Sequence, residues 1–322
     1  MMEINAAVVR SFDHPPRYES YDLPAPAGED EVVLDLLAAG LHPRVRTGAS
    51  GRHYTSTGEL PMVPGVDGVG RLPDGHLVYF VADDELTGPM ATRTVVDARR
   101  CVPLPDGVDV VKIAAAMNPA MSSWVALRRR VPIRTGHSVL ILGATGNAGQ
   151  MAIQVAKRLG AGRVVGAGRD QGRLALLPEI GADATVALTD DTYASLAEAA
   201  SEVDLVIDYL WGRPAGSAIM ALLLGRTDRG RELNWIQIGA MAGPTVELPS
   251  VALRSANFRL QGNGQGAVSA RAYLEELPAL VDEIDRGGIA VTARALPLAD
   301  VESVWTAPEV PGVRTVLVTE EV

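Results

Sequence analysis

The sequence predicts an α/β protein in which a doubly wound parallel sheet is combined with a second, β-rich domain. From Val111 onward, short apolar runs alternate with segments whose apolar residues have helical spacing. Such alternation is typical of parallel strands joined by right-handed helical crossovers. Before Val110, strand-like runs are separated by Gly and Pro. We expect the β-rich domain to comprise residues 1–119 and 265–322, and the parallel-sheet domain to comprise residues 120–264.

The individual elements follow from apolar runs and their spacing. In the β-rich domain, we expect strands at Ala6–Val9, Glu31–Leu37, His76–Val81, Thr92–Val96, Val291–Pro297 and Arg314–Thr319. In the other domain, we expect strands at Ser138–Ala144, Arg163–Gly168, Ala184–Leu188, Val203–Leu210, Leu233–Gly239 and Phe258–Gly262. Helices are expected at Ile113–Arg130 (interrupted near Pro119), Ala148–Leu159, Gly172–Leu177, Tyr193–Ala200, Ala215–Leu224 and Val268–Arg286.

Composition limits the classes of function. The 322 residues include 29 basic and 39 acidic side chains, a formal net charge of −10, which argues against a general nucleic-acid or anionic-membrane binder. The single cysteine, Cys101, excludes an intramolecular disulfide and a cysteine-based structural metal site. The N-terminal segment lacks the pattern of a secretory signal, and no run reaches the length of a membrane span. A cytoplasmic protein is therefore expected.

The stretch Ser138–Gly160 carries the main chemical signal. An apolar strand runs into a glycine-containing turn, which opens a helix with apolar residues at helical spacing. This order brings free N–H groups and a partial positive charge to a bound diphosphate. Gly146 lets the backbone approach the anion, and Gly149 lets the helix pack against the strand. The sequence therefore predicts a Rossmann dinucleotide site formed by Ala144, Thr145, Gly146, Asn147, Ala148 and Gly149.

The residues after the second strand of this unit indicate which dinucleotide is bound. Arg169 follows Gly149 by 20 residues, directly after Gly168, and Arg173 lies one helical turn further on. A guanidinium can bind the 2′-phosphate of NADP bidentately, which favours NADPH. Asp170 leaves NADH open, because an acid there can bind the ribose hydroxyls. The other alternative is that Arg169, Asp170 and Arg173 form a solvated surface cluster.

Several stretches across nearly the whole chain resemble the medium-chain dehydrogenase/reductase superfamily, in its zinc-independent quinone oxidoreductase and enoyl reductase branch. They are Leu60–Gly70, Val102–Gly107, Asn118–Arg129, Ile133–Gly136, Ser138–Gly149 and Gly181–Asp183. The resemblance implies a GroES-like catalytic domain at 1–119 and 265–322, a Rossmann domain at 120–264 and assembly as a homodimer. It also implies that Gly239, Ala240 and Met241 form the strand-end loop that faces the nicotinamide.

The zinc-dependent members of that superfamily use a Cys in a Gly-x-Cys loop and a His in a Gly-His-Glu segment. Here the matching places are Gly40-Leu41-His42 and Gly65-Val66-Asp67, so both ligands are replaced. His42 and Asp67 could form part of an unusual metal site, but a catalytic zinc needs a third protein ligand. We therefore expect no metal. The alternative interpretation is that Asp67 has a structural role, as a hydrogen-bonded turn residue.

Three residues are candidates for the catalytic chemistry. Tyr54 lies seven residues before Pro61, which matches the tyrosine placed over the substrate double bond in similar enoyl thioester reductases. Ser122 matches a threonine that lies beside the nicotinamide in the same family. His42 replaces the Asn of the metal-free branch, and a histidine is a suitable proton source near neutral pH. Each of these residues could instead have a purely structural role.

The resemblance and these residues together imply a function. Reduction of an activated C=C bond or a quinone needs a positioned hydride donor, a hydrogen-bond donor for the developing oxyanion and a source of protons. We expect an NADPH-dependent, zinc-independent oxidoreductase acting on a small-molecule quinone or α,β-unsaturated carbonyl compound. The alternatives are a metal-free carbonyl or alcohol oxidoreductase and a low-turnover NADPH-binding redox sensor.

Overall fold

The computed structural model describes residues 1–82, 86–189 and 193–319. The chain divides into two compact units. The first unit comprises Met1–Asn118, Leu277–Gly287 and Val291–Val322, and the second comprises Pro119–Glu276 and Gly288–Ala290. The second unit thus extends to Glu276, beyond the expected end at 264, because Glu276 accepts hydrogen bonds from Arg128 and Arg129 of the same unit.

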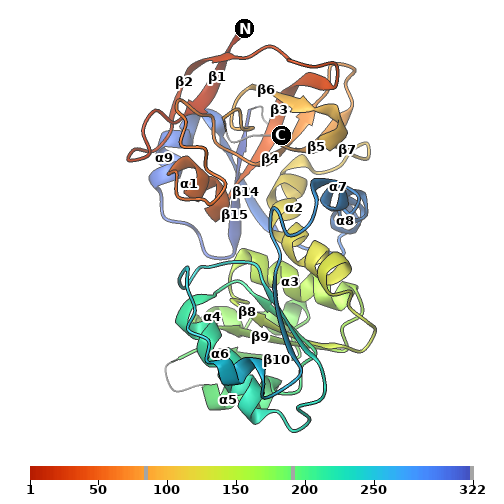
Figure 1. The fold of residues 1–322 in the computed structure, drawn as a ribbon. Helices are drawn as coiled ribbons and strands as arrows, with labels where there is room; N and C mark the ends of the chain where they lie inside the picture. Colours follow the sequence, from red (N-terminus) through yellow and green to blue (C-terminus); the bar gives the residue numbers. More distant parts are fainter. Residues whose placement is uncertain (83–85, 190–192, 320–322) are drawn as a thin grey trace. The chain divides into compact units, whose positions relative to one another are not determined.

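The first unit is β-rich. In its described residues, a seven-stranded sheet has the order β14-β15-β3-β4-β5-β7, with β6 paired to β3, and a separate hairpin is formed by β1 and β2 (Figure 1). The strands are β1 (Met2–Val8), β2 (Arg17–Leu23), β3 (Glu31–Leu41), β4 (Asp67–Arg71), β5 (Leu77–Val81), β6 (Arg93–Asp97), β7 (Cys101–Pro103), β14 (Thr292–Pro297) and β15 (Val313–Val318). The short helices are α1 (Pro43–Ala49), η1 (Ala98–Arg100), α8 (Leu277–Asp285), η5 (Leu298–Asp300) and α9 (Val301–Thr306).

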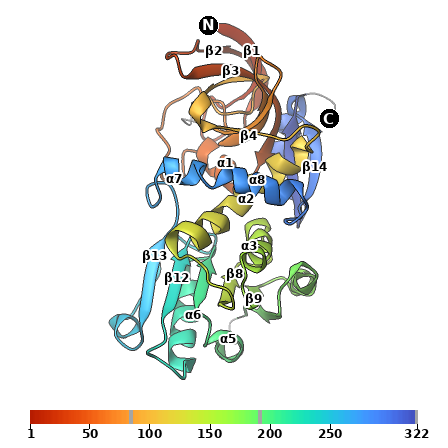
Figure 2. The same cartoon turned by 90° about the vertical axis from the view of Figure 1, so that its right-hand side faces the viewer.

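The second unit is the predicted doubly wound sheet, and the predicted fold class is confirmed. Its described strands form a six-stranded parallel sheet with the order β10-β9-β8-β11-β12-β13. The strands are β8 (Ser138–Leu142), β9 (Arg163–Gly168), β10 (Ala184–Ala187), β11 (Leu205–Asp208), β12 (Leu233–Gln237) and β13 (Phe258–Gly262). Strand β12 lies between β11 and β13, so β13 is an edge strand (Figure 2).

Helices of the second unit lie between these strands along the chain or follow the last one. They are α3 (Asn147–Arg158), α4 (Gln171–Leu174), η3 (Leu177–Ile180), α5 (Tyr193–Ala200), α6 (Gly212–Gly225), η4 (Ser250–Leu253) and α7 (Ala270–Leu274). Helix α3 contacts both β8 and β9. Its buried positions, which include Met151, Ala152, Val155 and Ala156, follow the predicted helical spacing. On the sheet, a hydrophobic core of the second unit combines apolar strand residues with the buried faces of α5 and α6.

One long helix differs from the expectation at Pro119. Helix α2 (Val110–Val125) passes through Pro119 without interruption and continues as the π-helical turn η2 (Ala126–Arg130). By length and composition, Val110–Arg130 could cross a membrane, which corrects our expectation that no run reaches that length. However, 72% of its apolar window is buried within the protein, as in the core helix of a globular protein. Among the described residues no other helix passes this test.

The expected single helix at Val268–Arg286 is two helices. Helix α7 ends at Leu274 and α8 begins at Leu277. Pro278 explains the break, because it has no N–H to bond the carbonyl of Leu274 four residues earlier, whereas a proline is tolerated in the first turn of a new helix. The break leaves Glu276 buried at the junction, with 3% of its surface exposed.

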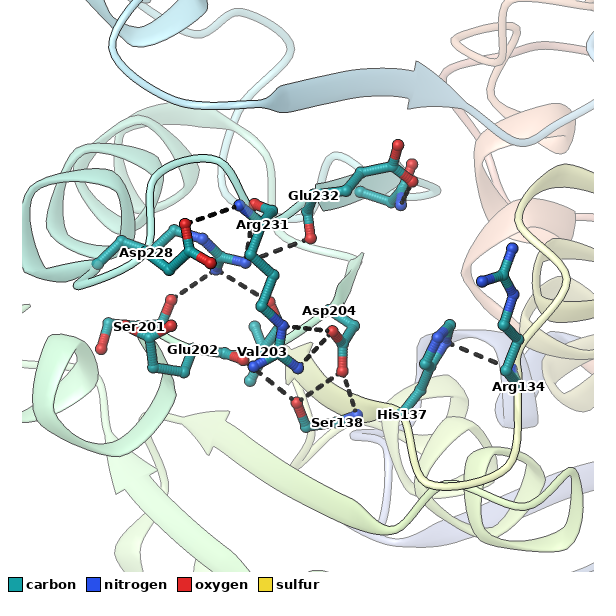
Figure 3. Close-up of polar contacts among 12 residues, drawn as sticks. Arg134, His137, Ser138, Ser201, Glu202, Val203, Asp204, Asp228, Arg231 and Glu232 are labelled. Atoms are coloured by element: carbon teal, nitrogen blue, oxygen red, sulfur yellow. Dashed lines mark hydrogen bonds and ion pairs between the residues drawn. The ribbon is translucent and has the colours of Figure 1, made fainter.

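A polar network secures the amino ends of three strands in the second unit. Asp204 accepts hydrogen bonds from the backbone and hydroxyl of Ser138, which begins β8, and pairs with Arg231 (Figure 3). The nearby buried Arg226 donates to four backbone carbonyls, those of Ser201, Val203, Arg231 and Glu232. The network lies at the end of the sheet opposite to the carboxyl ends of β8, β9 and β12, where dinucleotides bind in such folds.

Candidate functional site

The turn after β8 and the start of α3 form an anion cradle. Helix α3 has Gly146 as its N-cap, and no side chain caps it. The first N–H groups of a helix have no intrahelical partner, so they are available to a bound anion. The amides of Gly143 and Ala144 are bound to the carbonyl of Ala167 in β9, which fixes the turn on the sheet.

The two glycines of this turn have different steric roles. A Cβ on Gly149 would lie 2.3 Å from the carbonyl oxygen of Gly143, so only glycine lets α3 approach the strand this closely. A Cβ on Gly146 would meet only that same oxygen, at 3.4 Å. Gly146 is therefore not needed for packing within the protein, and the space beside it stays open on the outer side of the turn.

At the end of β9, Gly168 leaves room for the side chain of Thr145, whose Oγ1 would lie 2.8 Å from an added Cβ. The Asp170 carboxylate caps α4, and its Oδ1 accepts from the backbone N–H of Arg173 at 3.0 Å. This bond commits one Asp170 oxygen to the protein. Arg169 is exposed. The half-buried Arg173 has a buried Nη2 with no hydrogen-bond partner.

The loop after β12 is bound to the loop after β11. The amides of Gly239 and Met241 donate to the carbonyls of Asp208 and Tyr209, respectively. A Cβ on Gly239 would lie 2.7 Å from the Tyr209 carbonyl oxygen. Ala240 is exposed, and Met241 is 72% exposed. The candidate residues Gly239, Ala240 and Met241 therefore share the carboxyl edge of the sheet with the anion cradle.

Asp208 holds the loop after β11. Its Oδ1 accepts from the backbone N–H groups of Leu210 and Trp211 at 2.8 and 3.0 Å, and its Oδ2 accepts from Trp235 Nε1 at 3.1 Å. Burial raises the pKa of Asp208, while these three donors act in the opposite direction. Trp211 has φ 53° and ψ −157°, a backbone region that is largely restricted to glycine. The carboxylate thus helps to hold a strained loop beside the candidate cofactor residues.

Ser122 lies in α2 and is bound to Tyr209. The two hydroxyl oxygens are 2.9 Å apart, and Ser122 Oγ also donates to the carbonyl of Pro119 at 2.9 Å. Burial raises the pKa of Tyr209 to about 12, so this phenol stays neutral. The structure therefore places the candidate Ser122 beside a tyrosine that the sequence analysis did not identify.

Tyr54 lies in a loop of the first unit and is 72% exposed. Its ring stacks on His53, with centroids 4.4 Å apart and an interplanar angle of 33°. His53 Nδ1 is 2.7 Å from the hydroxyl of Thr55. An exposed tyrosine on a loop can present its hydroxyl to a ligand, and its stacking on His53 limits its orientations.

His42 belongs to a buried polar cluster in the first unit. Its Nε2 is 3.3 Å from Asp67 Oδ1, Tyr79 donates its hydroxyl to Asp67 Oδ2 at 2.6 Å, and Asn118 Nδ2 donates to Asp67 Oδ1 at 3.4 Å. His42 and Asp67 are each 3% exposed and Tyr79 is fully buried. Burial lowers the pKa of His42, and Asp67 offsets this only in part. Burial likewise raises the pKa of Tyr79 well above its ordinary value, so its hydroxyl remains a donor.

This cluster does not fit a zinc ion. A catalytic zinc needs three protein ligands, and the described residues contain no group of three or more His, Cys, Asp and Glu side chains able to hold a metal. Both Asp67 oxygens already face donors, namely His42 and Asn118 on one side and Tyr79 on the other. His42 and Asp67 therefore form a hydrogen-bonded pair rather than an incomplete metal centre.

Comparisons with known proteins agree with this geometry. The family model described as "Zinc-binding dehydrogenase" matches residues 148–262, within the second unit. The "Probable NADPH-dependent quinone reductase tdiC" of Emericella nidulans is 30% identical, over 98% of this chain and 100% of its own. The "2-methylene-furan-3-one reductase" of Solanum lycopersicum is 28% identical over 56% of this chain and 50% of its own. The quinone oxidoreductase of Thermus thermophilus, which was also solved with NADPH, has a TM-score of 0.77 and 27% identity, covering 94% of this chain and 95% of its own.

A parallel sheet with a glycine-lined anion cradle at its carboxyl edge, together with a β-rich unit, defines a dinucleotide-dependent oxidoreductase of two domains. The similarity to the Emericella protein covers essentially both chains. The chain belongs to the medium-chain dehydrogenase/reductase superfamily, in its quinone oxidoreductase branch.

Sequence reasoning missed Tyr79 and Tyr209 as members of these clusters. Tyr79 lies in the apolar strand β5, and Tyr209 directly follows the buried strand β11, so both look like core residues. A tyrosine in a buried strand needs a partner for its hydroxyl, which is the one signal the sequence offers. Identifying that partner requires the register between strands, and here β4 and β5 align Asp67 with Val81.

Proposed function

We propose that this protein is an NADPH-dependent, zinc-independent oxidoreductase that reduces a quinone or an α,β-unsaturated carbonyl compound. The observation that carries the proposal is the uncapped start of α3, where Gly149 permits a close approach to the turn and the side of Gly146 is left open. The names of two relatives support this class of hydride acceptor. The relative that is similar over nearly the whole chain is a probable quinone reductase, and one that is similar over about half of the chain is a 2-methylene-furan-3-one reductase.

The cofactor would be held by the second unit. The turn residues Ala144, Thr145, Gly146, Asn147, Ala148 and Gly149 fit the diphosphate. Arg169 and Arg173, next to Gly168, fit the additional phosphate of NADPH, and the unpartnered Nη2 of Arg173 is a donor that an anion would satisfy. Asp170 favours NADH less strongly than its position suggests, because one of its oxygens caps α4. Gly239, Ala240 and Met241 fit the nicotinamide side.

When bound, NADPH supplies the hydride. The remaining chemistry falls to the chain's own hydroxyl groups. Ser122 is oriented by Tyr209 and by the Pro119 carbonyl. Its hydroxyl oxygen keeps one lone pair, with which it could accept a hydrogen bond and so position the nicotinamide. Tyr54 has an exposed ring, so we assign it the hydrogen bond to the oxygen that gains negative charge. His42 is neutral and bound to Asp67, so we assign it no proton donation.

The test is NADPH oxidation measured with quinones, enones, enoyl thioesters and simple aldehydes, together with cofactor affinity. Turnover with quinones or enones and little with aldehydes is expected. Faster turnover of aldehydes would instead favour a carbonyl oxidoreductase. Tight NADPH binding without turnover of any acceptor would favour a redox sensor. Elemental analysis of the active protein is expected to find no stoichiometric zinc.

We further propose that the protein acts in the cytoplasm as a homodimer, with no nucleic-acid or membrane partner. Strand β13 supports the dimer, because among the described strands it pairs with β12 alone and lies at the edge of the sheet. The other candidate edge, Leu233–Gly239, is excluded since β12 is an interior strand. Sedimentation equilibrium should give a mass of two 33.9 kDa chains, and a monomer at micromolar concentration would contradict the proposal.

A further inference from the structure

The buried cluster around His42 determines which hydrogen-bonding atom the histidine can offer. Asp67 receives the Tyr79 hydroxyl on Oδ2 and faces both the Asn118 amide and His42 Nε2 with Oδ1. An oxygen that accepts from these donors is an acceptor toward His42 as well, so Nε2 must carry the hydrogen. The cluster therefore fixes the tautomer of the imidazole.

A neutral imidazole carries only one N–H group. His42 is neutral because its burial lowers its pKa, and the positive charges of Arg314 and Arg44 act in the same direction. With the single hydrogen on Nε2, the Nδ1 atom has only a lone pair. In the part of the chain that the structure describes, Nδ1 has no hydrogen-bond partner, and 4% of the side chain remains accessible.

A lone pair at this place discriminates between ligands. It attracts a hydroxyl or N–H group and repels a carbonyl or ether oxygen, which has lone pairs of its own. A site that offers a buried acceptor also disfavours analogues without a donor, because the acceptor is then left unsatisfied. The first unit thus contains a recognition element that is independent of the cofactor.

We propose that His42 Nδ1 accepts a hydrogen bond from the substrate, so that this oxidoreductase selects quinones or enones that carry a hydroxyl group. This inference rests on the proposed reductase function and names its substrate class. His42 is then a specificity-determining residue, and Asp67 is a positioning residue that acts through it. Tyr79 binds the other oxygen of Asp67 and does not contact the oxygen that faces His42.

The first experiment uses two matched pairs of substituted naphthoquinones with non-acidic side chains. Hydroxymethyl naphthoquinone is compared with its ethyl analogue, which has the same shape and no donor. Methoxymethyl naphthoquinone is compared with its propyl analogue. This second pair measures the effect of an oxygen that can accept a hydrogen bond but cannot donate one. For the wild-type protein we expect kcat/KM to be about tenfold higher for hydroxymethyl than for ethyl, as one hydrogen bond provides, and no gain for methoxymethyl over propyl. Equal values in the first pair would overturn the inference.

The second experiment changes the tautomer. In the Asp67→Asn variant, the Tyr79 hydroxyl donates to the amide oxygen, and the amide N–H₂ faces both His42 Nε2 and Asn118, whose own amide turns to present its oxygen. His42 Nε2 then accepts a hydrogen bond, and Nδ1 carries the hydrogen. The kcat/KM for the methoxymethyl compound should rise above that for the propyl compound, and the preference for hydroxymethyl over ethyl should fall. The matched control is Tyr79→Phe, which keeps the carboxylate and should keep the wild-type preference. A preference that Asp67→Asn leaves unchanged would contradict the role of Asp67.

Two measurements keep the outcome unambiguous. If Asp67→Asn does not fold, His42→Phe replaces it, and in this variant the ratio of kcat/KM for the hydroxymethyl and ethyl compounds must fall to about one. Calorimetric binding of the same four compounds reports the preference without turnover. A protein that reduces none of them and still binds hydroxymethyl about tenfold more tightly supports the inference and refutes the proposed function. Turnover of all four without any preference refutes the inference alone.

Discussion

At the scale of single residues, the cofactor assignment depends on Arg169. Its guanidinium is exposed and follows Gly168 directly, while Asp170 turns one oxygen back to cap α4. We expect Arg169→Ala to weaken NADPH binding by about tenfold or more, as the loss of charge-assisted hydrogen bonds predicts, and to change NADH binding by less than about twofold. Fluorescence titration with both cofactors measures this. Arg163→Ala, at the amino end of the same strand, is the control. Equal losses for both cofactors would refute the assignment.

Gly146 and Gly149 make a second residue-scale prediction, since they are neighbours with different steric roles. Gly149→Ala would force a Cβ to within 2.3 Å of the Gly143 carbonyl oxygen, so we expect a loss of roughly 1–3 kcal/mol in unfolding free energy. Gly146→Ala meets that oxygen only at 3.4 Å, so it should cost less than about 1 kcal/mol yet weaken NADPH binding about tenfold. Urea denaturation and cofactor titration separate the two effects. The prediction fails if both variants lose stability equally.

Whether a site could be predicted depends on how far apart its residues lie along the chain. The cradle could be predicted because one contiguous stretch supplies the strand, the turn and the helix start. The resemblance brought His42 and Asp67 together as possible ligands of one site, but their further partners could not be predicted, since Tyr79 lies on another strand and Asn118 on a helix. A tautomer set by hydrogen bonds from separate elements leaves no pattern in the sequence.

At the scale of elements, the junction of η2 with the segment after β13 is held by charge. The three arginines of η2 all have partners in the second unit. Arg128 and Arg129 bind the buried Glu276, and Arg130 donates to the carbonyls of Gly262 and Ala267. Burial tends to raise the pKa of Glu276, but the two arginines outweigh it, and the pKa is lowered. The ionised carboxylate therefore stabilises the fold.

We expect Glu276→Gln to lower the unfolding free energy by about 1–2 kcal/mol at neutral pH, a value reduced because both arginines are partly solvated. Since the folded pKa lies below the ordinary value of 4.5, the stabilisation is present above that pH and is lost as the pH falls through the folded pKa. The wild type and the variant should thus converge in acid. Urea denaturation across pH measures this, with the half-exposed Glu275→Gln as a control expected to change little. A difference that is constant with pH would argue against the carboxylate.

The elements themselves were predictable where hydrophobic pattern alone decides them, as in the six parallel strands of the second unit. Strand β4 was not predicted because it is rich in glycine. The glycines are needed because of close contacts with a neighbouring strand, which the sequence of β4 does not reveal. A Cβ on Gly70 would lie 2.9 Å from the backbone carbonyl oxygen of Asp35 in the neighbouring strand β3. Conversely, Pro119 suggested a helix break that tertiary packing of α2 overrides.

At the scale of the whole molecule, the two units have separate hydrophobic cores. One core gathers residues such as Leu36, Phe80 and Leu317, and the other gathers residues such as Leu142 and Trp235. Regions with their own cores can open independently, and a ligand protects the region to which it binds. All candidate cofactor residues, from Ala144 to Met241, belong to the second unit.

NADPH at about 100 times its Kd should therefore stabilise the second unit by about 2.7 kcal/mol, which slows the exchange of its most protected amides about a hundredfold. We expect this gain in β8, β9 and β11, and a much smaller one in the hairpin β1–β2. Hydrogen exchange followed by mass spectrometry with and without NADPH measures both regions in one sample. NADH at the same multiple of its own Kd is the control, because mass action then predicts the same gain. If β1–β2 gains as much protection as β8, the two units open together, and the separate cores do not act as separate cooperative units.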